Sequence, residues 1–382
     1  MTNSLDLIDD WGPEKIVVVS HRRTGMKGVL VIDNTARGVG KGGTRMAPSV
    51  TVTEIARLAR NMTWKWAGVD LFYGGAKAGI TADPTAPDKE AILRAFARAL
   101  SNEVPREYVF GLDMGLTEND AAIIQDELGD RGAAVGTPTH LGGVAYDQLG
   151  VTGFGVAEAA DAGAQAIGLP LSGARVAIQG YGAVGRAAAD RLTELGATIV
   201  AISTAHGARH TPAGFDVAEL NRLRDEHGDA FVTRMTVGNV LPAGAELLVD
   251  CDVLVPAALQ DVIDDDIAHQ LKASLVVEGA NLPTSPSAQQ ILANRGITIV
   301  PDFVANAGGV IAAAFAMDSR YSGFRGDTDT VFRTISDKLR SNAHLVLDTA
   351  LRGSVTPHQA GRQLAEARVR EAMRSKGRIP LT

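Results

Sequence analysis

The chain has 382 residues and a mass of 39.9 kDa, a length that predicts about two domains. Apolar residues make up 45% and charged residues 21%, as in ordinary globular proteins. The net charge of −7 excludes a broad basic surface for nucleic acid, and no run reaches the roughly 18 apolar residues of a membrane helix, so we expect neither partner.

The N-terminus and the cysteine content bear on the compartment. The first residues are acidic and lack the basic and apolar segments of a signal peptide. Cys251 is the single cysteine, so neither an intrachain disulfide nor a cysteine-based metal cluster can form. We therefore expect a cytoplasmic protein.

The first part of the chain mixes strands and helices. Val- and Ile-rich runs separated by a polar turn predict strands, and Thr51 or Thr53 is a suitable N-cap for the helix that follows. Leu58, Met62 and Lys65 have the spacing of one face of that helix. Further elements are expected as strands at 15–20, 27–33 and 107–110 and helices at 88–102 and 117–128.

Lys65 and Lys77 lie in a stretch, residues 61–80, that contains almost no other charge. Lysines are rarely buried without a partner, so this setting indicates a chemical role. The three small residues before Lys77, at 74–76, are expected to form a turn whose missing side chains let a ligand approach the backbone. Burial and neighbouring cations lower the pKa of a lysine and make it a usable base near neutral pH.

Asp113 follows the predicted strand at 107–110 and has almost no polar neighbours before Thr117. A carboxylate in that setting can pair with Lys77 and exchange protons with it, so that the two groups titrate as a coupled unit. The alternative is structural, with Asp113 capping the helix that begins at Thr117.

Residues 132–155 contain seven glycines and are the best candidate for a hinge between domains. Beyond this segment strands and helices alternate, which favours a parallel sheet covered on both faces. The expected strands are at 175–179, 197–203, 252–256, 275–278 and 297–301, with helices at 183–195, 331–351 and 356–376.

Gly180, Gly182 and Gly185 stand directly after an apolar strand and at the start of a helix. Glycines at this spacing allow a tight turn, close approach of a pyrophosphate and close helix packing, and the helix N-terminus favours the phosphate charge. In this context the fingerprint predicts a dinucleotide site that includes Ala183 and Val184. The alternative is a glycine turn with a purely structural role.

The end of the next strand bears on the cofactor. An NAD site normally has an acidic residue there to hold the ribose hydroxyls, but this strand ends in Ser203 and Thr204. With Arg209 nearby nothing repels a 2′-phosphate, so NADP is at least tolerated beside NAD; alternatively Arg209 is a solvated loop residue. His206 and His210 have no evident third ligand, and we predict no metal.

These elements predict an α/β protein with two domains. Residues 1–145 form an N-terminal α/β domain, and residues 146–329 form a Rossmann-type domain built on a doubly wound parallel sheet. No strand follows residue 330 in the predicted pattern, so the helices within 330–382 are expected to pack back on the first domain.

A series of motifs, in one order and over nearly the whole chain, resembles the glutamate, leucine, phenylalanine and valine dehydrogenase family. This family reversibly oxidises an L-amino acid to a 2-oxo acid and ammonia with a nicotinamide cofactor. Besides the dinucleotide fingerprint, the motifs are KGGTRM at 41–46, MTWKWA at 62–67, GGAKAG at 74–79, LDMG at 112–115, VPAAL at 255–259, EGANLPT at 278–284 and PDFVANAGGV at 301–310.

The resemblance implies roles for individual residues. Lys65 would bind the substrate α-carboxylate, Lys77 would activate the water that attacks the imine, and Asp113 would exchange protons with the amino group or ammonia. The first domain would bind the substrate and mediate assembly into a homo-oligomer, usually a hexamer or octamer. Other matches are Gly42, Gly43 and Met62 at the substrate, Thr152 and Asn281 at the nicotinamide, and Asn306 near both.

Lys41 and Ala313 give opposite indications about the substrate. Lys41 matches the lysine that glutamate enzymes place against the side-chain carboxylate, whereas Ala313 stands where those enzymes carry a serine. The region after Gly143, VAYDQ, also departs from their pattern. Because a buried ammonium without an anion is costly, we predict glutamate, with an aliphatic or aromatic amino acid as the alternative. Lys41 could otherwise pair with a protein carboxylate or point to solvent.

Two other classes compete with this reading. The glycine fingerprint alone would allow a dehydrogenase acting on a carbon–oxygen or one-carbon substrate. A nucleotide-sensing protein without catalysis is the non-enzymatic possibility. Neither explains why Lys65, Lys77 and Asp113 occur together.

Overall fold

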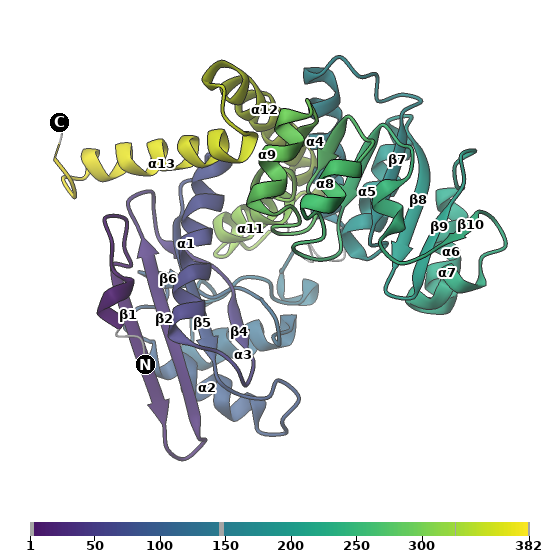
Figure 1. The fold of residues 1–382 in the computed structure, drawn as a ribbon. Coiled ribbons are helices and arrows are strands. Elements are labelled where there is room, and N and C mark those ends of the chain that lie inside the picture. Colours follow the sequence, from purple (N-terminus) through teal and green to yellow (C-terminus); the bar gives the residue numbers. More distant parts are fainter. Residues whose placement is uncertain (1–3, 145–148, 325, 381–382) are drawn as a thin grey trace. The chain divides into compact units, whose positions relative to one another are not determined.

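The computed structural model describes residues 4–144, 149–324 and 326–380. The chain divides into two compact units (Figure 1). Unit 1 comprises Met1–Tyr146, Val310–Thr328 and Leu364–Thr382, and unit 2 comprises Asp147–Gly309 and Asp329–Gln363. The expected division differs in the C-terminal part, where 329–363 belong to unit 2 and only the last part of the chain belongs to unit 1.

Unit 1 contains a mixed sheet with the strand order β1-β2-β5-β3-β6, in which β4 also pairs with β5. Strand β2 is antiparallel to both β1 and β5, whereas β3 and β4 run parallel to β5 and β6 runs parallel to β3. The strands are β1 (Lys15–His21), β2 (Met26–Asn34), β3 (Gly40–Lys41), β4 (Thr44–Met46), β5 (Gly74–Ile80) and β6 (Tyr108–Val109).

Alternation along β2 determines which helix covers which face of this sheet. Leu30 and Ile32 join the core beneath α2 (Lys89–Ala99) and α3 (Glu118–Leu128), whereas Val29 and Val31 pack with Ile55 of α1 (Val52–Gly68). This is the period of two that a strand buried on both faces requires. The helices predicted in this region are confirmed, including the N-cap, where the Thr51 side chain accepts a hydrogen bond from the Glu54 amide.

The turn predicted before Lys77 is wrong. Residues 74–76 belong to β5, a strand whose seven residues are all buried. A Cβ on Gly75 would lie 2.0 Å from Oγ1 of Thr63 and 2.6 Å from the carbonyl oxygen of Ala59, both on α1. The glycine is therefore needed for close packing of helix on strand rather than for ligand approach.

Unit 2 contains a seven-stranded sheet with the order β10-β9-β8-β7-β11-β12-β13. The five strands β8, β7, β11, β12 and β13 run parallel to one another, β9 is antiparallel to β8, and β10 at the edge is antiparallel to β9. The chain reverses its direction of travel across the sheet between β7 and β11, as in a doubly wound fold. The strands are β7 (Arg175–Gln179), β8 (Thr198–Thr204), β9 (Gly207–His210), β10 (Asn239–Leu241), β11 (Val253–Pro256), β12 (Leu275–Val277) and β13 (Thr298–Val300).

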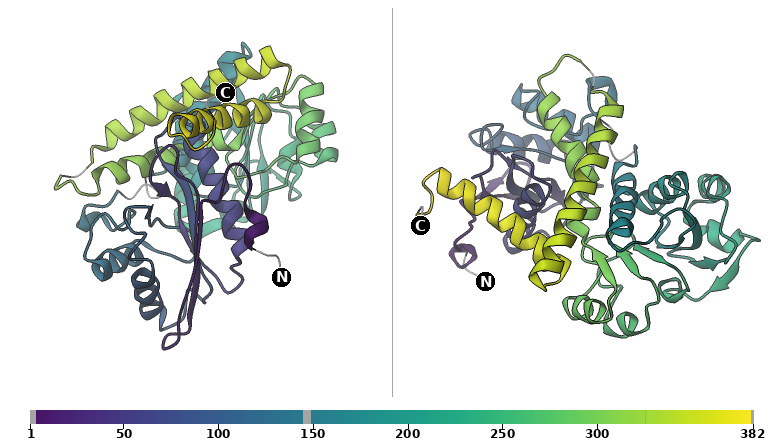
Figure 2. Two further views of the ribbon diagram at one scale, coloured as in Figure 1. Left: turned by 90° about the vertical axis from the view of Figure 1, so that its left-hand side faces the viewer. Right: turned by 90° about the horizontal axis from the view of Figure 1, so that it is seen from above.

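Helix α4 (Val151–Ala166) begins inside the segment expected to be a hinge, so residues 151–155 are helical. Its small residues allow close packing, since a Cβ on Gly153 would lie 2.2 Å from the carbonyl oxygen of Val184 on α5 (Ala183–Glu194). Helix α12 (Thr328–Gly353) lies beside α4 in unit 2 (Figure 2), and α13 (Pro357–Ser375) follows it.

The other helices of unit 2 are α6 (Val217–His227), α7 (Phe231–Arg234), α8 (Asp265–Gln270), α9 (Pro286–Asn294) and α10 (Asp302–Ala305), while α11 (Gly308–Ser319) passes into unit 1. In unit 1 the last turns of α13 pack through Ala365, Val369 and Met373 against Trp64 and Ala67 of α1. None of the described helices is long and apolar enough to cross a membrane.

Cys251 lies just before β11 and is buried. Burial, followed by the nearby charge of Asp252, raises the pKa of its thiol to about 12.

A buried carboxylate holds three helices of unit 2 together. Glu158 on α4 is fully buried, and it accepts hydrogen bonds from Arg191 of α5 at 2.7 Å and from Arg340 and Ser336 of α12 at 2.6 Å. Burial alone would raise the pKa of Glu158, but Ser336 and the two arginines lower it. The carboxylate is therefore charged at neutral pH and bridges helices that are distant in sequence.

Replacing this carboxylate should destabilise unit 2. We expect Glu158→Gln to lower the free energy of unfolding by about 3 kcal/mol, because it removes the buried anion that two partly buried guanidinium groups share and leaves them only their outer partners Glu194 and Asp161. Chemical denaturation followed by circular dichroism measures the change. Glu194→Gln is the matched control, since Glu194 pairs with the same Arg191 at the surface and should contribute less than about 1 kcal/mol. Equal changes in the two variants would contradict the bridging role.

Candidate functional site

Lys77 and Asp113 form an ion pair with a distance of 2.6 Å between Nζ and Oδ2. Lys77 is held on the buried strand β5, and Asp113 follows a bridge between Leu112 and Thr44 that extends the edge of the same sheet. The side chains are 10% and 22% exposed, so each retains some access from outside the core. The contact predicted between the two groups is therefore present in unit 1.

A second cation also reaches Asp113. The Nε of Arg45, on β4, lies 3.3 Å from Oδ2 of Asp113, and its Nη1 lies 2.7 Å from Glu54. Burial by itself raises the pKa of Asp113, but Lys77, the Met114 amide and Arg45 together lower it below its ordinary value. Asp113 is thus a carboxylate at neutral pH. The sequence reasoning missed Arg45, although it stands within the KGGTRM motif.

The structural alternative for Asp113 is wrong. Helix α3 is capped by Thr117, whose backbone and hydroxyl donate to Asp120 at 2.6 and 3.0 Å in a capping box. The Asp113 side chain is not needed for this cap. Its ion pairs with Lys77 and Arg45 account for its position instead.

Lys41 is buried, with 3% of its surface exposed, and its Nζ donates to the backbone carbonyls of Phe110 at 2.8 Å and Val109 at 3.3 Å. Both alternatives considered for it are wrong, because within the described residues it neither forms an ion pair with a carboxylate nor points to solvent. Burial, then the charges of Lys77 and Arg320, hold the pKa of Lys41 well below its usual range. A Cβ on Gly111 would lie 2.4 Å from this Nζ, so the absent side chain makes room for the amine.

The glycines after Lys41 are required by packing. A Cβ on Gly42 would lie 1.7 Å from the carbonyl oxygen of Ala76 and 3.3 Å from Cγ of Met62, and one on Gly43 would lie 2.8 Å from Cβ of Asp113. They bring β5, α1 and the Asp113 loop together around Lys77. Lys65 and Met62 are half-buried on α1, and Ala313 is half-buried on α11 in the same unit.

The glycine fingerprint of unit 2 forms the predicted strand, turn and helix, with β7 ending at Gln179 and α5 beginning at Ala183. Gly180 has φ +89°, which favours glycine, and a Cβ on Gly185 would lie 2.0 Å from the carbonyl oxygen of Gly180. A Cβ on Gly182, in contrast, would meet nothing within 4 Å. That open side, at the amide groups that begin α5 with Ala183 and Val184, fits the pyrophosphate of a dinucleotide.

The end of β8 is uncharged, as expected, but its hydroxyls have partners. Ser203 Oγ accepts a hydrogen bond from the Gly180 amide at 3.0 Å, and Thr204 Oγ1 donates to the carbonyl of Asp229 at 2.8 Å. The alternative that Arg209 is a solvated loop residue is wrong. It is buried on β9, and its guanidinium donates to the carbonyls of Val232 and Gly238. Arg209 therefore ties β9 to α7 and to the residue that precedes β10.

Three other predicted residues gather at the carboxyl edge of the same sheet. Asn306 Nδ2 donates to Oδ1 of Asn281 at 3.1 Å, and a Cβ on Gly309 would lie 3.1 Å from Oγ1 of Thr152. Asn281 lies in the loop after β12, and Asn306 lies at the end of α10. Thr152 lies in the first turn of α4. Residues 145–148, most of the divergent VAYDQ region, lie outside the described residues.

The chain matches two family models over most of its length. One is described as Glutamate/Leucine/Phenylalanine/Valine dehydrogenase and matches residues 142–377. The other is described as Glu/Leu/Phe/Val dehydrogenase, dimerisation domain, and matches residues 13–130.

Named relatives are similar over nearly the whole chain. The glutamate dehydrogenase of Thermotoga maritima is 36% identical over 364 residues, which cover 92% of this chain and 87% of that protein. The NAD-specific glutamate dehydrogenase of Staphylococcus aureus is 36% identical over 355 residues, covering 90% and 84%. The crystal structure of hetero-hexameric glutamate dehydrogenase from Thermus thermophilus, in its Leu bound form, has a TM-score of 0.82 and 31% identity, covering 96% of this chain and 91% of that chain.

The resemblance inferred from the motifs and the expected α/β architecture are both confirmed by these matches. The chain therefore belongs to the glutamate/leucine/phenylalanine/valine dehydrogenase family and is an oxidoreductase that acts on amino acids.

Proposed function

We propose that the protein catalyses the reversible oxidative deamination of L-glutamate to its 2-oxo acid and ammonia. The contact between Lys77 and Asp113, at 2.6 Å in a partly buried setting, carries this proposal because it joins a proton donor to a proton acceptor. The relatives named glutamate dehydrogenase support the choice of substrate.

The roles of the chain's own residues follow from their charges. Lys65, half-buried on α1, binds the substrate α-carboxylate. Asp113 is ionised at neutral pH and accepts a proton from the substrate amino group. Lys77 orients the water that attacks the imine, and its hydrogen bond to Asp113 gives the proton from this water a path away from the reacting carbon. A nicotinamide dinucleotide, when bound at Gly180–Gly185, supplies the hydride acceptor.

Lys41 selects the side chain of the substrate in this proposal. Its amine lies in a site where burial and two cations oppose protonation, and a substrate carboxylate would reverse that balance by supplying the missing anion. An apolar amino acid supplies no such anion, and a protonated Lys41 would then be a buried charge without a partner, which is costly. An apolar amino acid is the alternative substrate, because Ala313 provides no hydroxyl group that could bind the side-chain carboxylate of glutamate.

The dinucleotide and the assembly belong to the same proposal. The end of β8 carries no acid that would repel a 2′-phosphate, and the guanidinium of Arg209, which could attract one, is bound to the carbonyls of Val232 and Gly238. We infer that NAD and NADP are both accepted. The match to a dimerisation domain and the hetero-hexameric relative support assembly into an oligomer, which we propose to be a homo-oligomer.

A substrate panel tests the proposed function. The protein is mixed with ammonia and one of several 2-oxo acids, with NADH and NADPH in separate reactions, and the nicotinamide absorbance is followed. We expect 2-oxoglutarate to be the best substrate, and both nucleotides to be used within about tenfold of one another. If no 2-oxo acid is turned over with either nucleotide, the proposal is wrong. A preference for an apolar 2-oxo acid would instead establish the alternative substrate.

Lys41→Ala tests side-chain selection. The variant should lose about a hundredfold in kcat/KM for glutamate, because the substrate carboxylate loses its buried partner, and should keep any activity on leucine or phenylalanine. Lys27→Ala, at an exposed lysine of β2, is the control. Equal losses on acidic and apolar substrates would show that Lys41 acts on the fold and not on selection.

Asp113→Asn tests proton exchange. An amide of the same shape cannot accept the proton, so kcat should fall by about 10²- to 10⁴-fold while dinucleotide affinity is unchanged. Glu54→Gln is the matched control, because Glu54 pairs with the same Arg45 but does not touch Lys77. Stopped-flow measurements of hydride transfer give the rates. A similar loss in both variants would mean that only the ion-pair network matters.

A further inference from the structure

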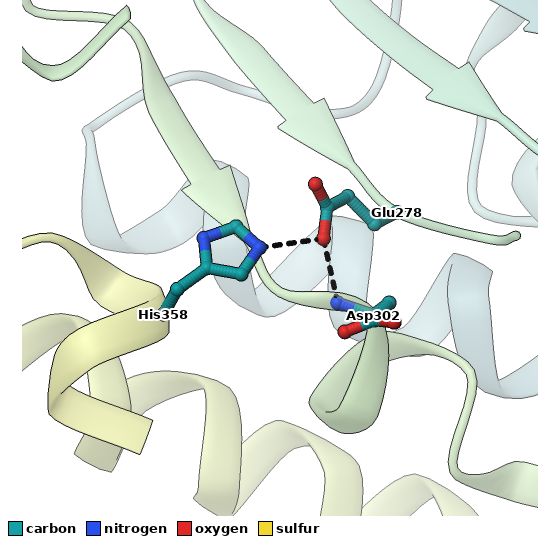
Figure 3. A group of neighbouring side chains, drawn as sticks. All are labelled: Glu278, Asp302 and His358. Atoms are coloured by element: carbon teal, nitrogen blue, oxygen red, sulfur yellow. Dashed lines mark hydrogen bonds and ion pairs between the residues drawn. The ribbon is translucent and has the colours of Figure 1, made fainter. Parts of the chain in front are cut away.

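Unit 2 contains a buried ionisable cluster that the proposed chemistry does not use (Figure 3). Glu278 directly follows β12 and is fully buried, Asp302 begins α10, and His358 lies in the first turn of α13. Oε2 of Glu278 lies 2.8 Å from Nε2 of His358 and accepts the backbone amide of Asp302 at 2.8 Å. One carboxylate oxygen thus connects three segments that are far apart in the sequence.

The cluster fixes the loop 279–282. The Leu282 amide donates to Oδ2 of Asp302 at 2.8 Å. On the other side of the loop, Asn306 Nδ2 donates to the carbonyl of Ala280 at 3.3 Å and to Oδ1 of Asn281. The position of Asn281 therefore depends on α10, and the position of α10 depends on Glu278.

This loop belongs to the edge of the sheet that carries the glycine fingerprint. The amides of Gly279 and Ala280 both donate to the carbonyl of Pro256, at 3.0 and 2.9 Å, at the end of β11. Strand β11 pairs with β7, and a Cβ on Gly180 would lie 2.6 Å from Cβ of Ala258. The loop 279–282 and the glycine turn after β7 are thus connected through β11, so a shift of the loop changes the surface next to the turn.

The electrostatics of the cluster depend on His358. The charged groups that face its ring are Glu278, after β12, and Asp302, on α10, while on α13 itself Arg362 is one turn away and exposed. Burial lowers the pKa of His358, but Glu278 and then Asp302 outweigh this and raise it above the ordinary 6.5. Among the described residues, His358 is the cationic partner of Glu278.

A metal ion is a poor occupant of this cluster. The Glu278 oxygen nearest His358 already accepts a backbone amide, and a cation there would face the Asp302 N–H and have to displace the imidazole. Asp302 likewise accepts the amides of Leu282 and Phe303 on its two oxygens. The arrangement is that of a hydrogen-bonded ion pair.

We propose that His358 is a positioning residue, which acts through Glu278 and Asp302 on the loop 279–282 and so sets the affinity for the nicotinamide dinucleotide. This inference rests on the proposed function only in placing the dinucleotide at this edge of unit 2. When His358 is protonated, the Glu278 carboxylate is neutralised and the loop is held. When the imidazole loses its charge, Glu278 is a buried anion with a weaker donor, and the loop loosens.

The experiment compares four full-length proteins: wild type, His358→Gln, His358→Arg and His344→Gln. His344 is an exposed histidine of α12 and gives the matched control. Dissociation constants for NADH and NADPH are measured by nicotinamide fluorescence without amino acid, near pH 6 and near pH 9, and KM values for dinucleotide and amino acid are measured separately. Dinucleotide affinity measured without amino acid tests this inference alone. The proposed function is tested by turnover, so the two can fail independently.

We expect His358→Gln to weaken dinucleotide binding about tenfold near pH 6, because a charged hydrogen bond is lost, and to leave the KM of the amino acid unchanged. His358→Arg should restore binding, since a guanidinium is a permanent cation. In wild type the contribution is present below the ordinary histidine pKa of 6.5 and is lost as the pH rises through the raised pKa, whereas His358→Arg should bind equally well at both pH values.

Two results would overturn the proposal. One is that His358→Gln binds dinucleotide as well as His344→Gln does. The other is that His358→Arg is folded, as judged by its melting temperature, yet binds no better than His358→Gln. If His358→Gln does not fold, wild type and His358→Arg are compared at the two pH values. The same change of dinucleotide affinity with pH in both proteins would show that His358 does not cause the pH dependence, and would contradict the proposal.

Discussion

The organisation of unit 1 depends on the placement of an ammonium group on a strand that is buried along its whole length. Lys77 can occupy β5 only because Asp113 supplies an anion 2.6 Å away. That requirement fixes the loop after β6, and Arg45 strengthens it from β4. The glycines at 42, 43 and 75 serve the same end, since larger side chains would keep the neighbouring strands and α1 at a distance.

The charges around Asp113 balance only while Lys41 is uncharged. Lys77 and Arg45 contact Asp113, Arg45 also pairs with Glu54, and the charge of Lys77 opposes the protonation of Lys41. Protonation of Lys41 therefore requires an incoming anion. A carboxylate of the substrate would supply this anion. A surplus of cationic groups over anionic groups is usual in a binding site for acids.

Features of the fold and of the site could be predicted from the sequence where the residues that cause them are close together in the chain. The strand, turn and helix at 175–194 were predicted almost to the residue, because the glycine spacing itself determines the turn. The pairing of Lys77 with Asp113 followed from the scarcity of other charges nearby. In contrast, the glycines before Lys77 suggested a turn. They are small because α1 packs closely against the strand through residues 59 and 63, and this cause cannot be seen in the local sequence.

Other features depended on contacts that have no local signature. Arg209 was expected near a ribose but is bound to carbonyls of Val232 and Gly238, more than 20 residues away in the chain. Helix α4 was hidden by its glycines, which are poor helix formers, and by small buried residues on nearly all of its sides, which give no amphipathic period but allow it to pack against α5. The contact between Glu278 and His358 spans 80 residues and could not be found from spacing.

The position of Cys251 has a practical consequence. A thiol with a pKa of about 12, packed in the core beside β11 and only 3% exposed, has almost no thiolate at neutral pH and little contact with solvent. Oxidants and alkylating agents should therefore not modify Cys251 in the native enzyme. Modification of this single sulfur then reports the opening of the parallel sheet itself, so the chain carries its own probe of unfolding, and no engineered label is required.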